Sequence, residues 1–178
     1  MLLLLCTGMA ETSFAQSRGG NGPVTPVRVG SVTLNLGVGA GGRYKGDDNS
    51  TFGTKAALEF GLWQAGPGVI TLGGQVGASF SNRGFNDDYK SRTLVVGVRS
   101  AWHYGWKVRG LDTYGGLSTG MAFHHHTHKN FDGDTDEVFP IVGAFLGASY
   151  FVSPRFGFNA EVGDDITSFQ AGIIFKLK

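Results

Sequence analysis

From residue 32 onward, apolar side chains alternate with small or polar ones. At the start of this stretch, Val32 and Leu34 alternate with Thr33 and Asn35, and the alternation continues to residue 40. A period of two over this length predicts a β-strand with one apolar and one polar face. The pattern returns seven more times, near residues 52–62, 70–80, 93–104, 111–123, 142–150, 156–162 and 168–177.

The length of these segments and the spacing between them predict a membrane barrel. Each segment has about ten residues or more, which suits a tilted strand that crosses a bilayer and exceeds the five or six that are usual in soluble sheets. Short connections, such as residues 64–68 and 152–155, alternate with longer polar ones, such as 45–51 and 82–91. We therefore predict an all-β fold, an eight-stranded antiparallel up-and-down transmembrane β-barrel, over residues 30–178.

The alternative is a soluble eight-stranded barrel of the lipocalin type, whose apolar face points inward. Here glycines share the polar face with Thr, Asn, Gln and Ser, a mixture that cannot form a soluble core. Aromatic residues lie at both ends of the apolar face and aliphatic residues in its middle, which is typical of the two lipid interfaces of a membrane barrel. The predicted interface aromatics are Tyr44, Phe80 and Phe123 at the loop end, with Trp102, Tyr104, Tyr150 and Phe175 at the turn end.

Charged residues on the polar face predict an ion-paired lumen. Arg43, Lys55 and Glu161 fall near the loop end of their strands, and Glu59 and Arg99 fall near mid-height. Buried charges are retained when they are paired. We therefore expect these five residues to form a charge network inside the barrel.

The N-terminal residues and the composition refine this interpretation. Residues 1–15 (MLLLLCTGMAETSFA) predict a secretory signal peptide, because leucines precede small residues that suit cleavage after Ala15. The Gly- and Pro-rich residues 16–29 predict a mobile segment. Cys6 is the one cysteine, so the mature chain would have no disulfide. The 30 glycines oppose long helices, and the formal charge of +1 gives no footprint for nucleic acid.

The eight-strand layout resembles the small outer-membrane barrels of the OmpA/OmpX type. The segment GASYFVSPRFGFNAEVG (residues 147–163) and the final segment FQAGIIFKLK (residues 169–178) resemble the Bacteroidetes-type outer-membrane β-barrel domain family. The shared features are a Gly-small-aromatic strand, a Ser-Pro turn and an inward Glu161. One departure is that Lys178 follows Leu177, whereas many such proteins end on an aromatic residue that the insertion machinery reads.

The resemblance implies where the protein lies and what surrounds it, and it does not imply one activity. It implies an integral protein of the cell outer membrane with extracellular loops and a periplasmic N-terminus. The expected partners are outer-membrane lipid, lipopolysaccharide and the barrel-insertion machinery, with no nucleic acid, and the chain is expected to be a monomer.

Residues 123–137 (FHHHTHKNFDGDTDE) are the one stretch that suggests a metal site. His124, His126 and His128 could reach one zinc ion, and Asp132 and Asp134 would add oxygen ligands. However, the spacing does not fit an EF-hand, and a loose loop loses ordering entropy when it binds a metal. We interpret residues 124–137 as a hydrophilic extracellular loop and expect no cofactor.

Three classes of function remain open. The lack of a catalytic constellation favours a non-enzymatic surface protein with a structural, adhesive or partner-binding role. A lipid-modifying enzyme would need a Ser–His pair at the membrane surface; His126-Thr127-His128 is the nearest match to a His-x-Ser motif, and Ser118 and His103 fall at different heights. A narrow porin is the third class, although side chains fill the interior of an eight-stranded barrel.

Overall fold

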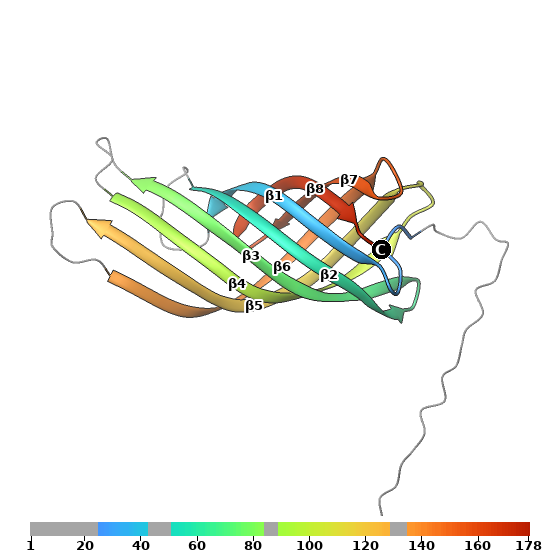
Figure 1. The fold of residues 1–178 in the computed structure, drawn as a ribbon, viewed down its shortest axis with the longest axis horizontal. Coiled ribbons are helices and arrows are strands. Elements are labelled where there is room, and N and C mark those ends of the chain that lie inside the picture. Colours follow the sequence, from blue (N-terminus) through green and yellow to red (C-terminus); the bar gives the residue numbers. More distant parts are fainter. Residues whose placement is uncertain (1–24, 43–50, 84–88, 129–134) are drawn as a thin grey trace, which may run out of the picture.

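The chain folds as a closed barrel of eight antiparallel strands, which confirms the predicted fold (Figure 1). The computed structural model describes residues 25–42, 51–83, 89–128 and 135–178. Each strand pairs with the next one along the chain, and β8 pairs with β1 to close the sheet. The strands are β1 (Val32–Gly42), β2 (Thr51–Ala65), β3 (Gly68–Arg83), β4 (Tyr89–Gly105), β5 (Leu111–His128), β6 (Thr135–Phe151), β7 (Phe156–Gly163) and β8 (Thr167–Lys176). Among the described residues, no helix is long and apolar enough to cross a membrane.

The barrel has an apolar exterior and a polar interior. Exposed side chains along the strands include Leu36, Val76, Val98, Leu117 and Leu146, whereas buried polar side chains outnumber buried apolar ones among the described residues. This is the reverse of a soluble protein, in which large apolar side chains are buried. It follows directly from the period of two, because successive side chains of a strand point to opposite faces of the sheet.

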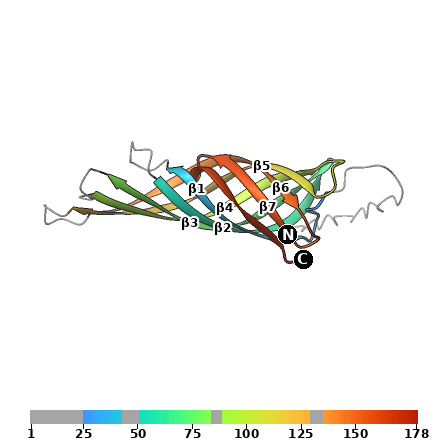
Figure 2. The ribbon, with the colours of Figure 1, turned by 90° about the horizontal axis from the view of Figure 1, so that it is seen from above.

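Strands β3 to β6 have 16 to 18 residues and extend beyond β1, β7 and β8 at the loop end (Figures 1 and 2). The loop expected over residues 124–137 is therefore shorter than predicted. Strand β5 continues to His128, β6 begins at Thr135, and His124 pairs with Glu137. Backbone pairing continues past the apolar segment because ladder hydrogen bonds do not depend on side-chain polarity, and the change in side-chain pattern therefore did not mark the strand end.

The connection between β7 and β8 folds back into the barrel. Ile166 is completely buried and packs with Val95, Ala122 and Ile141. The backbone N–H of Asp164 donates to the Ala144 carbonyl at 3.1 Å. Small residues make room for the connection: a side chain at Gly77 would collide with Ile166, and one at Gly143 would collide with Asp165. This short connection thus covers the lumen at the loop end.

Residues 25–31 cover the opposite end. Val27 is completely buried, and the backbone of Gly30 and Ser31 bonds to Gly61 of β2, next to a register shift in the β2–β3 pairing. The Lys176 ammonium donates to the Pro26 carbonyl at 2.8 Å. The segment expected to be mobile through residue 29 is therefore packed against the barrel from residue 25, because the buried valine and these backbone hydrogen bonds hold it there.

Candidate functional site

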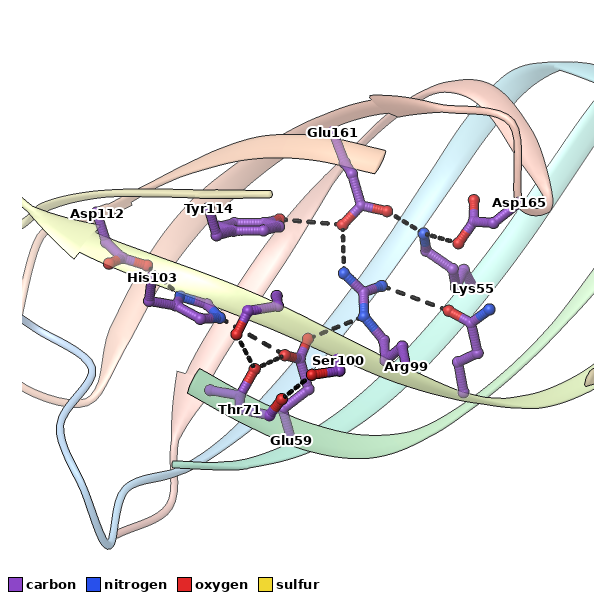
Figure 3. A network of polar contacts seen from close by, with 12 residues as sticks. Lys55, Glu59, Thr71, Arg99, Ser100, His103, Asp112, Tyr114, Glu161 and Asp165 are labelled. Atoms are coloured by element: carbon purple, nitrogen blue, oxygen red, sulfur yellow. Dashed lines mark hydrogen bonds and ion pairs between the residues drawn. The ribbon is translucent and has the colours of Figure 1, made fainter. Parts of the chain in front are cut away.

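A network of buried charges occupies the middle of the lumen, with Arg99 of β4 at its centre (Figure 3). The Arg99 Nε lies 3.0 Å from Glu59 Oε1 of β2, and one terminal guanidinium nitrogen lies 2.8 Å from Glu161 Oε2 of β7. The guanidinium also lies over the Phe145 ring, 3.8 Å from its centroid. Two carboxylates and an aromatic face thus compensate one fully buried cation, as a buried charge requires.

Toward the loop end, Lys55 of β2 joins two acids. Its ammonium donates to Glu161 Oε1 and lies 3.0 Å from Asp165 Oδ2 in the β7–β8 connection. The Tyr114 hydroxyl donates to Glu161 Oε2 at 3.1 Å. The network therefore ties the covering connection to the wall of the barrel.

Toward the turn end, the network continues through a histidine. Glu59 Oε2 accepts from the Thr71 hydroxyl at 2.5 Å and lies 3.5 Å from His103 Nε2. The other ring nitrogen of His103 lies 2.7 Å from Asp112 Oδ2. The imidazole also stacks on Tyr114, with 4.9 Å between ring centroids. His103 is therefore fixed between two carboxylates, both buried.

The arrangement does not provide the parts of a hydrolase. A Ser–His hydrolase needs a hydroxyl beside the free nitrogen of the histidine, but here both ring nitrogens of His103 face carboxylates. Ser118 pairs across the sheet with Arg99, whereas His103 pairs with Tyr114, so the serine lies four residue pairs away along the barrel. All of these groups are buried. The ion pairs hold these charges in place inside the barrel.

The structure brings together four of the five lumen residues predicted from the sequence, and the fifth lies outside the described residues. Lys55, Glu59, Arg99 and Glu161 form one connected network, and Arg43 lies outside the described residues. The five lumen charges predicted as a network did not include Tyr114, His103, Asp112 and Asp165. Strand parity, counted from Arg99 and Ser118, places the first three on the inward face. Asp165 had no such signal, because an acidic pair in a short connection is typical of a solvated turn.

The predicted interface aromatics lie on the outward face, where the structure describes them. Phe80 and Phe123 are exposed at the loop end, Trp102 and Tyr150 are exposed at the turn end, and Tyr104 and Phe175 are half-buried there. Tyr44 lies outside the described residues.

The metal-site candidates do not form a cluster in the described part of the chain. His124, predicted to lie on a loop, is a buried strand residue, and its Nδ1 lies 2.6 Å from the Thr93 hydroxyl. No group of three or more potential metal ligands occurs among the described residues. Asp132, Asp134 and the side chains of His126 and His128 lie outside them.

The fold has counterparts among solved structures, although the sequence matches no known protein family and no curated protein. Neisserial surface protein A is similar with a TM-score of 0.54 and 10% identity, over 83% of this chain and 94% of that one. The N-terminal β-barrel domain of Pseudomonas aeruginosa OprF is similar with a TM-score of 0.52 and 14% identity, over 84% of this chain and 98% of that one. The narrower resemblance to the Bacteroidetes-type domain stays a prediction. At these identities the likeness concerns the fold: this chain has the fold of the small eight-stranded outer-membrane barrels.

Proposed function

We propose that this chain is an integral outer-membrane protein without catalytic activity, with a structural or surface-interaction role exerted through extracellular loops. The observation that carries the proposal is the inverted distribution of side chains. Exposed Leu, Val and Phe side chains surround the barrel, while Arg99, Glu59 and Glu161 are buried inside it. In water such an exterior would be a large aggregation-prone patch; in a bilayer it is the expected lipid-facing band.

The buried network favours a barrel with a filled lumen and disfavours an open channel. Arg99, Tyr114 and Phe145 fill the middle of the lumen, while Ile166 covers one end and Val27 the other. A diffusion pore needs a continuous water-filled path, and these side chains obstruct it. The same burial opposes an enzyme, because a substrate would have to enter through groups that are held by several ion pairs.

The orientation follows from the two ends of the barrel. Residues 25–31 and the turns after β2, β4 and β6 lie at one end, and the strand ends on either side of residues 43–50, 84–88 and 129–134 lie at the other (Figure 1). Two of the connections at that other end, residues 43–50 and 129–134, are longer than any of the three turns. Outer-membrane barrels have short periplasmic turns and longer extracellular loops. We therefore assign the N-terminal segment to the periplasm and the connections after β1, β3 and β5 to the cell surface.

Epitope insertion tests both the location and the orientation. A tag inserted at Asn130 should be stained on intact cells, whereas a matched tag at Pro154, in the β6–β7 turn, should be stained only after permeabilisation. Both tagged proteins should fractionate with the outer membrane and migrate differently on gels when they are not heated. Staining at Pro154 alone on intact cells would invert the topology, and recovery in the soluble periplasm would end the proposal.

A further inference from the structure

The turn end of the barrel carries a set of basic side chains that the lumen network does not use. We refer to these residues as the basic rim. They come from residues 25–31, the β4–β5 turn, the β6–β7 turn and the C-terminal residues, and all are exposed except Lys176, which is partly buried. The basic rim consists of Arg28, Lys107, Arg109, Arg155, Lys176 and Lys178.

These cations are not neutralised within the part of the chain that the structure describes. None of the six forms an ion pair there. Asp112, the acid at this end of β5, is completely buried and faces His103. Two of the cations, Arg28 and Lys176, line the same groove, and the Lys176 ammonium is held there by the Pro26 carbonyl.

Exposed apolar side chains are interleaved with the cations. Val29 follows Arg28, Val108 separates Lys107 from Arg109, and Leu177 separates Lys176 from Lys178. The exposed fractions of Val29, Val108 and Leu177 are 52%, 56% and 56%, and Trp106 and Val152 are also exposed. A surface that meets a soluble polyanion gains nothing from these side chains. A surface at the level of lipid headgroups does, because its apolar groups reach the acyl region while its cations meet phosphates.

A groove at the basic rim is lined by both cationic and apolar side chains. It has a volume of about 580 Å³, and its lining includes Arg28, Arg109 and Lys176 together with Tyr150, Phe151 and Val152. Tyr150 belongs to the exposed outward face of β6, so the groove reaches the wall that would meet lipid. Its three cations suit a phosphate, and its apolar side suits the glycerol and upper acyl carbons attached to that phosphate.

We propose that the basic rim binds the phosphate groups of anionic phospholipids in the leaflet at the turn end of the barrel, with one headgroup in the groove beside Arg28, Arg109 and Lys176. The inference rests on the proposed function, since it requires a membrane-embedded barrel. Its consequence is an anchor: the rim fixes the height of the barrel in the bilayer from the periplasmic side and selects anionic lipid neighbours.

Lipid adducts on the folded protein test this directly. The barrel, folded in a non-ionic detergent, is mixed with equal amounts of phosphatidylglycerol and phosphatidylcholine of the same acyl chains, and bound lipids are counted by native mass spectrometry. Phosphatidylglycerol adducts should dominate. The triple variant R28Q/R109Q/R155Q should lose this preference by roughly a hundredfold, because each of the three cations near an anionic surface contributes about fivefold.

Two further variants separate charge from folding. The triple variant R28K/R109K/R155K keeps the charges and should keep most of the preference. The variant Arg92→Gln removes an exposed cation from the loop end of β4 and should leave the preference unchanged. All variants are first checked for the unheated-gel mobility of a folded barrel. A wild-type chain that never shows this mobility contradicts the proposed function, whereas a folded chain without lipid preference contradicts only the basic-rim proposal.

Inorganic phosphate and a soluble polyphosphate distinguish the source of the anion. Neither should displace phosphatidylglycerol at millimolar concentration, because neither engages the apolar side chains of the rim. Displacement by either compound, or equal adducts of the two lipids on the wild-type chain, would overturn the proposal. So would a glutamine variant that keeps its preference for phosphatidylglycerol.

Discussion

At the scale of single residues, the lumen depends on pairing each buried cation with carboxylates. Glu161 illustrates this, because its carboxylate accepts hydrogen bonds from Lys55, Arg99 and Tyr114. Removing one partner of a buried ion pair leaves an uncompensated charge, which costs far more than the pair itself contributes. We therefore expect the network to fix a single arrangement of the lumen more than to add net stability.

We expect Glu161→Gln to lower the free energy of unfolding by about 3–5 kcal/mol, because Lys55 and Arg99 would each lose a buried counter-charge. Tyr114→Phe is the matched comparison, since it removes only a hydroxyl from the same carboxylate and should cost about 1.5–3 kcal/mol. Urea titration of the barrel in vesicles, followed by tryptophan fluorescence, measures both. A larger loss for Tyr114→Phe would show that charge compensation is not the dominant effect.

Two neighbouring glycines of β3 make a second residue-scale prediction. A side chain at Gly73 would collide with the backbone of Leu58 and Glu59, whereas one at Gly74 would find its nearest atom, the Gly97 carbonyl oxygen, at 3.8 Å. Gly73→Ala should therefore cost about 1–3 kcal/mol through overpacking, and Gly74→Ala should cost almost nothing. Folding yields and urea midpoints in vesicles compare the two variants, and equal values would contradict the close approach of β2 and β3 at Gly73.

At the scale of elements, the sequence predicted the strands well where one face of the sheet is apolar and the other is polar. Because side chains on the outward face differ in polarity from those on the lumen face, Val96 and Arg99 were correctly assigned to opposite faces. Beyond the apolar band the two faces of the strand no longer differ in polarity, and the strand extension from His124 to His128 was therefore interpreted as a loop. The inward fold of Asp165 and Ile166 was missed for another reason: it depends on space left by glycines of distant strands, such as Gly77 and Gly143.

The β7–β8 connection is the element whose packing is easiest to test. Ile166→Ala should lower the free energy of unfolding by about 2–5 kcal/mol, because it opens a cavity among Val95, Ala122 and Ile141. Val162→Ala, on the exposed outward face of β7, is the control and should cost clearly less. Urea titration in vesicles again provides the measurement. Equal losses would indicate that the connection does not pack into the lumen.

At the scale of the whole molecule, the barrel resembles a soluble protein turned inside out, with polar packing at its centre. Its lumen is obstructed at three levels, by Ile166 at the loop end, by the network around Arg99 in the middle and by Val27 at the turn end. The two covers are single aliphatic side chains from short segments. The middle level joins β2, β4 and β7 by ion pairs, and we therefore expect it to be the main barrier to ions.

Conductance measurements can rank these levels. We expect the wild-type chain in planar bilayers to show almost no conductance, and Val27→Gly combined with Ile166→Gly to remain nearly silent, because the central network still fills the lumen. Adding Glu59→Gly and Arg99→Gly should open discrete channels, because it removes the Glu59 carboxylate and the Arg99 cation that joins this carboxylate to Glu161. Since both partners of the Glu59–Arg99 ion pair are removed together, neither is left as an uncompensated buried charge. Each variant must first show the unheated-gel mobility of a folded barrel. Channels that open after the end changes alone would mean that the two covers, and not the charge network, keep the barrel closed.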